Sequence, residues 1–229
     1  MNRRLVVTDV TDMGIDIACV AGIDAVTREV LRLESPRPKR RLLQDYGGLI
    51  PGSIIEVDWT PHHSPAAPHV EDGYWNPGTL VKRGQMEEEE LTEFLSVDAF
   101  NSVSEAFGEP AKHGTGGNVA FQPREGPRSL ATVRTITVQF TVWPDKVRVD
   151  FQDGSGRMWT AAPLQDLAVK WHRGHCETCA TVFEARLRRE FEGSGGMVRV
   201  GLAREWNGGC WLQVNAVCLG RREHFLPTT

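Results

Sequence analysis

Long hydrophobic runs are absent from this 229-residue sequence, and their absence excludes a membrane-spanning helix. A helix that crosses a bilayer needs about 20 predominantly apolar residues, whereas even the stretch Leu5–Val10 is interrupted by Thr8 and Asp9. The opening Met-Asn-Arg-Arg also lacks the apolar segment of a secretory signal. We therefore expect a cytoplasmic protein with no membrane partner.

Cysteine is scarce, and the sequence signatures of common enzymes are missing. The five cysteines are an odd number in a chain long enough to fold without cross-links, which fits a reducing compartment. The Gly-rich segment 114–117 lacks the Lys-Ser/Thr of a P-loop, and there is no nucleophile elbow or kinase signature. These absences predict a binding protein without a cofactor rather than an enzyme.

Basic residues are few in the middle of the chain. Residues 44–110 contain 2 Lys or Arg against 13 Asp or Glu, whereas residues 1–43 contain 8 against 6 and residues 111–229 contain 16 against 11. This distribution excludes a uniformly basic coat for nucleic acid. It leaves room for a basic face opposite an acidic one.

The first half combines dense β-branched segments with one long irregular stretch. The β-branched segments predict strands over residues 4–10, 17–23, 29–33 and 53–59. The segment Pro61–Pro77 contains further prolines and three histidines, so it predicts a long loop of the kind that often carries function. Apolar residues at helical spacing predict a helix over Glu87–Phe107 that ends at Gly108.

The second half alternates more clearly between apolar and polar residues. Ile136, Val138, Phe140 and Val142 are predicted to share one face of a strand over residues 134–142. Further strands are expected over residues 147–151, 157–161, 197–203 and 210–219, with a helix over residues 176–191 between the third and fourth strands of this half. This is the element order of an OB fold, a five-stranded, partly open barrel. We predict a mainly β protein of two OB-like partly open barrels in tandem, over residues 1–110 and 111–229.

Eight segments spread over almost the whole chain carry a resemblance to a known family. They are Arg4–Val10, Cys19–Ile23, Pro68–Trp75, Arg128–Val133, Val147–Arg157, Gln165–Leu167, Gly201–Arg204 and Cys210–Ala216. Together they resemble the dual OB-containing domain, a prokaryotic family. The resemblance implies two OB-like units and a role in conflict with phages and other invading genetic elements, and it assigns no catalytic residue. The segment His172–Cys179 does not match the family.

That unmatched segment contains the metal-capable side chains His172, His175, Cys176 and Cys179. A structural zinc site combines a close Cys pair with two further ligands, and only one such Cys pair is present. The alternative is a loop that enters a helix with two small buried thiols. We expect no bound metal, and a zinc content well below one equivalent would support this.

Residues His69, Glu71 and Asp72 stand close together in the long loop, and Trp75 follows them. A histidine beside two carboxylates can bind a metal or move a proton, so a metal-dependent enzyme is one alternative. The simpler interpretation is that these side chains satisfy the backbone of a long loop, because no activated nucleophile accompanies them. We treat His69, Glu71, Asp72 and Trp75 as a functional loop. Trp75 and Trp206 are both expected in loops, where an indole can stack on a base.

Positive charge is concentrated between Pro36 and Arg41. Two prolines hold this segment extended, and we expect its cations, Arg37, Lys39, Arg40 and Arg41, to have no neutralising carboxylate. With Arg128 and Arg134 they are predicted to hold the phosphates of DNA or RNA on a barrel face. The sequence thus favours a nucleic-acid-binding accessory protein of a bacterial antiviral defence system.

The acidic middle segment supports an alternative function. Nucleic acid would be repelled by residues 44–110, whereas a basic protein would be attracted. In that case the chain is an interaction subunit that docks on a partner protein of the defence system.

Overall fold

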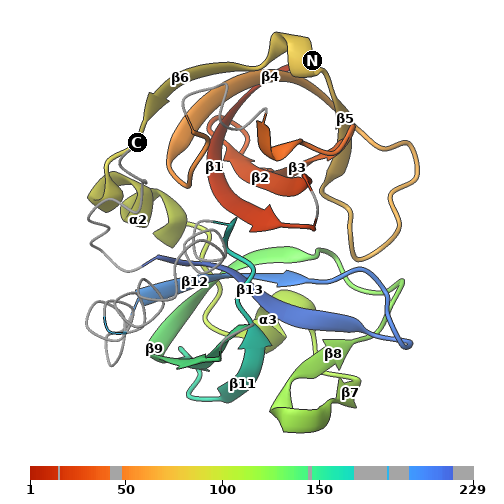
Figure 1. Ribbon diagram of the computed structural model, residues 1–229, viewed down its shortest axis with the longest axis vertical. Helices are drawn as coiled ribbons and strands as arrows, with labels where there is room; N and C mark the ends of the chain where they lie inside the picture. The colour runs from red at the N-terminus through yellow and green to blue at the C-terminus, as the bar shows by residue number, and fades with distance from the viewer. Residues whose placement is uncertain (15, 42–47, 144–145, 168–184, 186–195, 219–229) are drawn as a thin grey trace.

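The computed structural model describes residues 1–14, 16–41, 48–143, 146–167, 185 and 196–218. These residues form two β units, which lie one above the other in Figure 1. The predicted helix over residues 176–191, apart from Ala185, and the metal-capable segment 172–179 lie outside the described residues. No described helix is long and apolar enough to cross a bilayer.

Six strands form the first unit: β1 (Asn2–Asp12), β2 (Ala18–Asp24), β3 (Val30–Ser35), β4 (Ser53–Pro61), β5 (Asp72–Trp75) and β6 (Val81–Gln85). Five of them close into a barrel in the order β1-β2-β3-β5-β4, because β4 also pairs with β1. Strands β3 and β5 run parallel, and the other neighbours in the barrel run antiparallel. The short 3-10 turn η1 (Pro77–Thr79) connects β5 to β6.

Strand β5 lies inside the segment predicted to be an irregular loop, so that prediction is wrong for residues 72–75. The strand is short, and its Asp-Gly-Tyr-Trp sequence is poor in β-branched residues. Gly73 is required by packing, because a Cβ there would lie 2.2 Å from the indole of Trp59. That indole crosses the strand and donates its Nε1 hydrogen to the carbonyl of Arg32 at 3.1 Å.

Seven strands form the second unit: β7 (Lys112–His113), β8 (Val119–Phe121), β9 (Leu130–Val142), β10 (Val147–Asp153), β11 (Met158–Pro163), β12 (Gly196–Leu202) and β13 (Cys210–Cys218). They make one curled sheet in the order β11-β10-β9-β12-β13-β8-β7. A parallel bridge between Leu164 and Val214 brings the end of β11 to β13. Strands β9 to β13 therefore repeat the strand order of the first barrel as a half-barrel, and the prediction of two tandem OB-like units is confirmed.

The predicted apolar face of β9 is interrupted at Ile136, which is exposed. The pairing of β9 with β10 shifts there, since Thr137 pairs with Gln152 and Thr135 with Asp153. A bulge of this kind moves the following side chains to the other face. Val133 before it and Val138 after it are consequently both buried in the second core.

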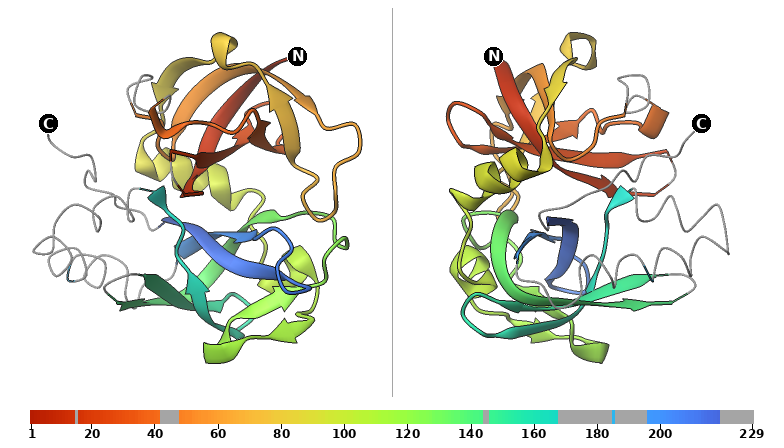
Figure 2. Two further views of the ribbon diagram at one scale, coloured as in Figure 1. Left: turned by 45° about the vertical axis from the view of Figure 1, so that its right-hand side comes forward. Right: turned by 90° about the vertical axis from the view of Figure 1, so that its left-hand side faces the viewer.

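Two helices connect the units, where the sequence predicts one helix over residues 87–107. Helix α2 (Glu88–Ser96) lies beside the junction of the units in Figure 2, and its Leu91 and Leu95 share an apolar cluster with β1, β2 and β12. Helix α3 (Val103–Phe107) packs in the second core. The helix breaks between them because Phe100 hydrogen-bonds to β9, and the Ser102 side chain then caps α3.

Candidate functional site between the barrels

The predicted functional loop is attached to the start of β9 by Glu71. One carboxylate oxygen of Glu71 accepts hydrogen bonds from the backbone nitrogens of Ser129, at 2.7 Å, and Leu130, at 3.1 Å. The other oxygen accepts from the Ser129 hydroxyl at 2.9 Å. These residues are buried, so the Glu71 carboxylate joins the first barrel to the second unit.

Asp72 connects three elements of the same junction. Its Oδ1 accepts from Nη1 of Arg32, on β3, at 2.9 Å, and its Oδ2 accepts from Arg204, in the turn after β12. The second terminal nitrogen of Arg32 donates to the Ser129 hydroxyl at 2.9 Å. Both Asp72 and Arg32 are buried. The ion pairs therefore position two guanidinium groups next to each other at the contact between the units.

His69 is a neutral hydrogen-bond donor at this junction. Its Nδ1 lies 3.3 Å from Nη1 of Arg32, and because a guanidinium only donates, Nδ1 accepts and the ring proton is on Nε2. Burial, and then the charges of Arg204 and Arg32, lower the pKa of His69 to about 3. Its Nε2 is buried and has no hydrogen-bond partner among the described residues.

A cavity of about 300 Å³ lies between the two units beside these residues. Strands β2 and β3 contribute Cys19, Arg32 and Glu34 to its wall, and the second unit contributes Arg204 from the turn and Asn215 from β13. The face of strands two and three is where OB folds bind their ligands. In this protein the second unit covers that face of the first barrel and leaves a cavity beneath it.

Two ionisable groups in the cavity wall, Cys19 and Glu34, have pKa values shifted in opposite directions. Burial raises the pKa of the Cys19 thiol, so the thiol is protonated near neutral pH. Burial also opposes ionisation of Glu34, yet the hydrogen bond from Ser35 and the charge of Arg204 lower its pKa. The cavity thus presents fixed charges and hydrogen-bond donors, with neither a thiolate nor a carboxylic acid ready to donate a proton.

A second polar contact joins the units at their centre. Arg199 of β12 is 1% exposed, and its Nη2 lies 2.7 Å from a carboxylate oxygen of Asp9 in β1. Its Nη1 donates to the Thr132 hydroxyl at 2.9 Å, and the Thr8 hydroxyl donates to Asp9 at 2.7 Å. The pair is fully buried and hydrogen-bonded across the interface.

The predicted nucleic-acid-binding residues fall into two groups. Arg37 lines the cavity and is exposed, and Lys39 and Arg41 are exposed in the same segment. The expectation that these cations lack carboxylates is wrong for Arg37, which pairs with Glu34 at 3.4 Å, and for Arg40, which pairs with Asp12. The Pro36–Arg41 segment therefore borders the cavity with part of its charge neutralised. The expectation that it is extended is wrong for Arg40 and Arg41, which are helical.

The second group lies around Phe100. Arg128 stacks its guanidinium over the Phe100 ring at 4.6 Å, and exposed Arg134 donates to the carbonyl of Ser96 at 2.7 Å. Both side chains therefore support the segment that joins α2 to α3.

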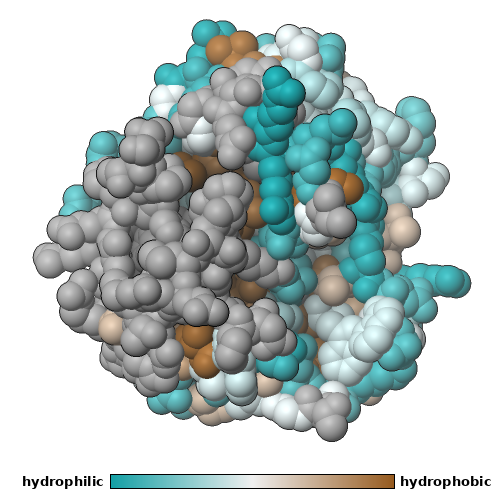
Figure 3. Space-filling view, in the orientation of Figure 1, coloured by the Kyte–Doolittle hydropathy of each residue, from teal (hydrophilic) through white to brown (hydrophobic). Residues whose placement is uncertain are grey.

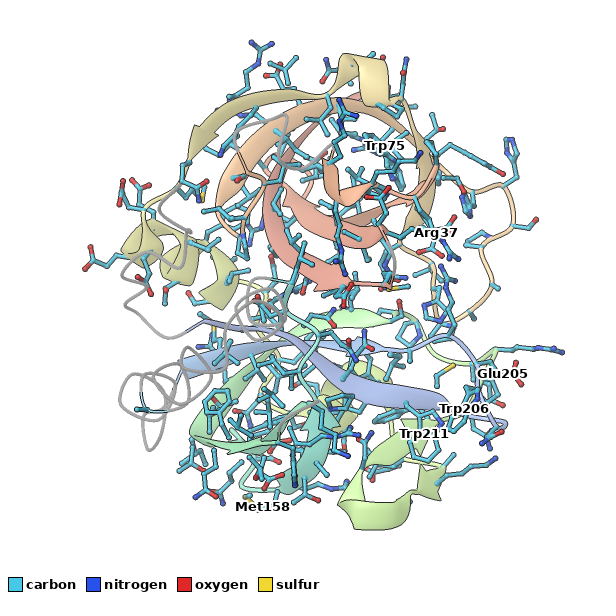
Figure 4. The ribbon with its side chains drawn as sticks, viewed as in Figure 1. Arg37, Trp75, Met158, Glu205, Trp206 and Trp211 are labelled. Atoms are coloured by element: carbon cyan, nitrogen blue, oxygen red, sulfur yellow. The ribbon has the colours of Figure 1, made fainter. Side chains whose placement is uncertain are left out.

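The two tryptophans expected in loops have different environments. Trp75 belongs to β5 and is buried, with its Nε1 donating to the carbonyl of Pro36, so it does not offer a face to a base. Trp206 is 66% exposed in the turn between β12 and β13. Figure 4 shows Trp206 and Trp211 on the same side of the molecule as Arg37, and the described surface on that side of Figure 3 is mainly hydrophilic.

The turn that carries Trp206 is held firmly. Asn207 and Gly208 have positive φ angles of 51° and 66°, which fits the type I′ turn preferred by tight hairpins. Backbone hydrogen bonds join Trp206 and Gly209 in both directions, and Trp211 donates its Nε1 hydrogen to the Trp206 carbonyl at 3.0 Å. The backbone of Trp206 is consequently held in place, and its exposed indole lies 6.4 Å from the ring of Trp211 between centroids.

The comparison with known families agrees with this geometry. The family model of the dual OB-containing domain matches residues 16–217. This chain belongs to the dual OB-containing domain family. No curated protein shows significant similarity to it. In this dual OB-containing domain the matched region includes all the cavity-wall residues named above. Thr11 and Met13 also line the cavity and lie just before the start of the matched region.

Sequence reasoning missed most of the cavity wall of the dual OB-containing domain. Arg32 is a charged residue in the middle of a predicted strand, and Arg204 follows an apolar strand directly. Each is an ordinary surface cation by sequence alone. Only the packing of two units turns both toward Asp72 and buries one of them.

Proposed function

We propose that this dual OB-containing domain binds single-stranded nucleic acid on the side of the molecule where Trp206 and the interbarrel cavity lie, and that it performs no chemistry. The observation that carries the proposal is the exposed indole of Trp206, fixed on a tight turn two residues after Arg204. Base stacking on an exposed ring, combined with cations along the backbone, is how OB folds bind single strands.

Cations around the indole support a path for phosphates. Arg204 and Arg37 line the cavity, and Lys112 donates to the carbonyl of Asn207 at 3.0 Å beneath the same turn. Arg124 lies 3.8 Å from Glu205 with most of its side chain exposed. A strand that stacks a base on Trp206 would therefore meet positive charge on either side of that base.

The hydrogen bonding of the functional loop supports binding without catalysis. The Glu71 carboxylate already accepts three hydrogen bonds, and Asp72 is paired with two arginines. His69 has a guanidinium on its Nδ1 atom. A general base or a metal ligand needs a free lone pair. These contacts occupy the one lone pair of the neutral His69 ring and engage both carboxylate oxygens of Glu71 and of Asp72.

A matched pair of tryptophan variants tests the proposed binding face. Fluorescence anisotropy would measure the affinity of single- and double-stranded DNA and RNA for the wild type, Trp206→Ala and Trp143→Ala. Trp143 is the control because it is also exposed and lies near a cation, Lys146, but follows the far end of β9. Loss of one stacked base should weaken single-strand binding by about 5- to 150-fold in Trp206→Ala. Equal affinities of the two variants would remove Trp206 from the site.

The role of the basic segment is tested by salt dependence. The double variant Arg37→Ala/Lys39→Ala should lose phosphate contacts. Each lost contact should reduce the slope of log affinity against log salt concentration by about 0.7 for a single strand. Arg40 is left in place because its pair with Asp12 holds the segment. An unchanged slope would place the phosphates elsewhere.

We further propose that the binding serves bacterial defence against invading genetic elements, as the family resemblance implies. Host cells that depend on the wild-type gene for resistance to a phage should become sensitive when it carries Trp206→Ala. If the purified protein binds none of the four nucleic acids, the alternative function is favoured. Exposed Glu87, Glu89 and Glu90 at the start of α2 would then offer an acidic surface to a partner protein.

A further inference from the structure

We propose that the cavity between the barrels binds one phosphate-bearing nucleotide, so that the protein recognises the phosphorylated end of a strand. The inference rests on the proposed function, because Trp206 would stack a neighbouring base. It goes further because it names a separate pocket with its own ligand, a terminal nucleotide. An internal stretch of nucleic acid would bind without using that pocket.

Two buried donors that belong to cavity-lining residues lack an acceptor in the part of the chain that the structure describes. They are Nε2 of His69 and Nε of Arg32, and neither has a hydrogen-bond partner among the described residues. Both residues are at least 90% buried, with exposures of 5% and 7%. A buried donor without an acceptor destabilises the folded protein. A ligand that brings acceptor oxygens into the cavity removes this cost.

The charges of the wall favour an anion. Among the described residues, three guanidinium groups, those of Arg32, Arg37 and Arg204, line the cavity together with one carboxylate, that of Glu34. Asp72 pairs with two of these arginines from behind the wall. Three guanidinium groups and one carboxylate therefore line the cavity, and arginine is the side chain best suited to phosphate oxygens.

The size and remaining walls of the cavity fit a nucleotide better than a bare phosphate. A volume of about 300 Å³ is at the lower end of the range for small-molecule sites. Leu33 and Leu202 give it apolar surface, against which a flat ring can pack. Gln213 donates to Asn215 at 3.0 Å, which leaves the carbonyl of Gln213 and the amino group of Asn215 to hydrogen-bond a base edge.

One residue of the cavity wall is close in sequence to the stacking surface. Arg204 lines the cavity and stands two residues before Trp206 in the same turn. A terminal nucleotide held in the cavity would place the next nucleotide near that turn. The geometry therefore assigns phosphate and first base to the cavity, and the following base to Trp206.

The first test uses free probes on the whole protein. Nucleoside 5′- and 3′-monophosphates, nucleosides and inorganic phosphate would each be titrated by calorimetry and by thermal unfolding. A monophosphate should bind at least tenfold more tightly than its nucleoside, because one charge-assisted hydrogen bond to the phosphate is enough for a tenfold gain in affinity. Inorganic phosphate alone should bind more weakly than the nucleotide. The absence of binding by both monophosphates at millimolar concentration would overturn the inference.

The second test uses oligonucleotides of one sequence with a 5′-phosphate, a 3′-phosphate, neither, or a circular form. The oligonucleotide that is phosphorylated at one of its two ends should bind about tenfold or more tightly than the other forms. The phosphorylated end of that oligonucleotide is the end that the cavity holds. Ala203→Leu is designed to fill the cavity while keeping its donors, and Arg37→Ala removes an exposed cation with little risk to folding. Both should abolish the preference for the phosphate.

The two proposals fail in different ways. Circular and linear strands that bind equally, with no nucleotide binding, would overturn the cavity site and leave the proposed function intact. Nucleotide binding without any oligonucleotide binding would support the cavity and overturn the proposed function. Trp206→Ala should weaken oligonucleotide binding but leave the affinity for a monophosphate unchanged, and equal losses of both would contradict the separation of the two sites.

Discussion

In the first barrel β5 pairs with β3 on one side and β4 on the other, whereas in the second unit the end of β11 meets β13 through the isolated bridge of Leu164 and Val214. The second unit extends its sheet with β8 and β7 instead, and the 3-10 turn η2 (Thr115–Gly117) packs on β11, where the Thr160 hydroxyl donates to the Gly117 carbonyl at 3.2 Å. One strand order therefore tolerates two ways of covering the barrel interior.

The units also differ in where their buried polar groups lie. The first barrel directs Asp9, Arg32 and Glu71 toward its neighbour. The second unit keeps Asp153 inside, where one carboxylate oxygen accepts from Nε1 of Trp159 at 2.7 Å and from the backbone of Val103 at 3.1 Å. Arg199 and Ser129 of the second unit meet these groups at the interface, whereas the hydrogen bonds of Asp153 lie wholly within the second unit, so that part of its interior is self-contained.

The largest expected effect comes from breaking the central ion pair. Arg199→Leu leaves the Asp9 carboxylate buried without its partner and should lower the free energy of unfolding by about 3–5 kcal/mol, measured by urea denaturation. Arg83→Ala, which breaks the exposed pair of Arg83 with Glu56, is the control and should cost no more than about 1 kcal/mol. Combining Arg199→Leu with Asp9→Val should recover much of the loss, and a double variant as unstable as the single one would argue against an uncompensated charge.

A smaller effect is expected from pH at the same junction. The pKa of His69 is lowered to about 3 in the folded protein, and an unfolded histidine titrates near 6.5. The unfolded state therefore binds the proton first, so stability is fully present above about pH 6.5 and falls toward pH 3. Between pH 6 and pH 4 the wild type should lose about 2–3 kcal/mol more than His69→Gln, measured by urea denaturation at each pH. Parallel pH profiles would show that His69 is not buried as a neutral ring.

The smallest effect tests the interior of the second unit. Trp159→Phe removes one hydrogen bond to the buried Asp153 carboxylate and should cost about 1–2 kcal/mol. Trp143→Phe, at an exposed position, should change stability by less than about 0.5 kcal/mol. If the second unit is self-contained, Trp159→Phe will leave both the pH profile and the affinity for single strands as in the wild type. A changed pH profile would show that the two units share one polar network.

The sequence predicted the long strands well because their alternation and β-branched residues are local properties. It failed at β5, whose identity as a strand depends on Trp59 packing over Gly73, and at Ile136, where a bulge changes the buried face. The single helix over residues 87–107 failed for the same kind of reason, since Phe100 is held by β9 rather than by its own neighbours.

The site was harder to predict than the fold. The loop with His69, Glu71 and Asp72 was singled out from its residue types, and the structure places all three at the interbarrel junction. Their partners Arg32, Ser129 and Arg204 are 37 to 132 residues away in sequence. No local pattern connects residues so far apart, because the contact exists only after two barrels have packed.

The buried pair of Asp9 and Arg199 also determines how a ligand would meet the cavity. A displacement of β12 by one residue along β1 would separate two charges that have no access to water, so the pair favours the observed relative position of the units over such displaced ones. The cavity walls contributed by each unit are then already at their final spacing before anything enters. Binding would need little ordering of the protein. The free energy of a few hydrogen bonds to the ligand would therefore contribute to the affinity without being offset by the cost of closing the two units.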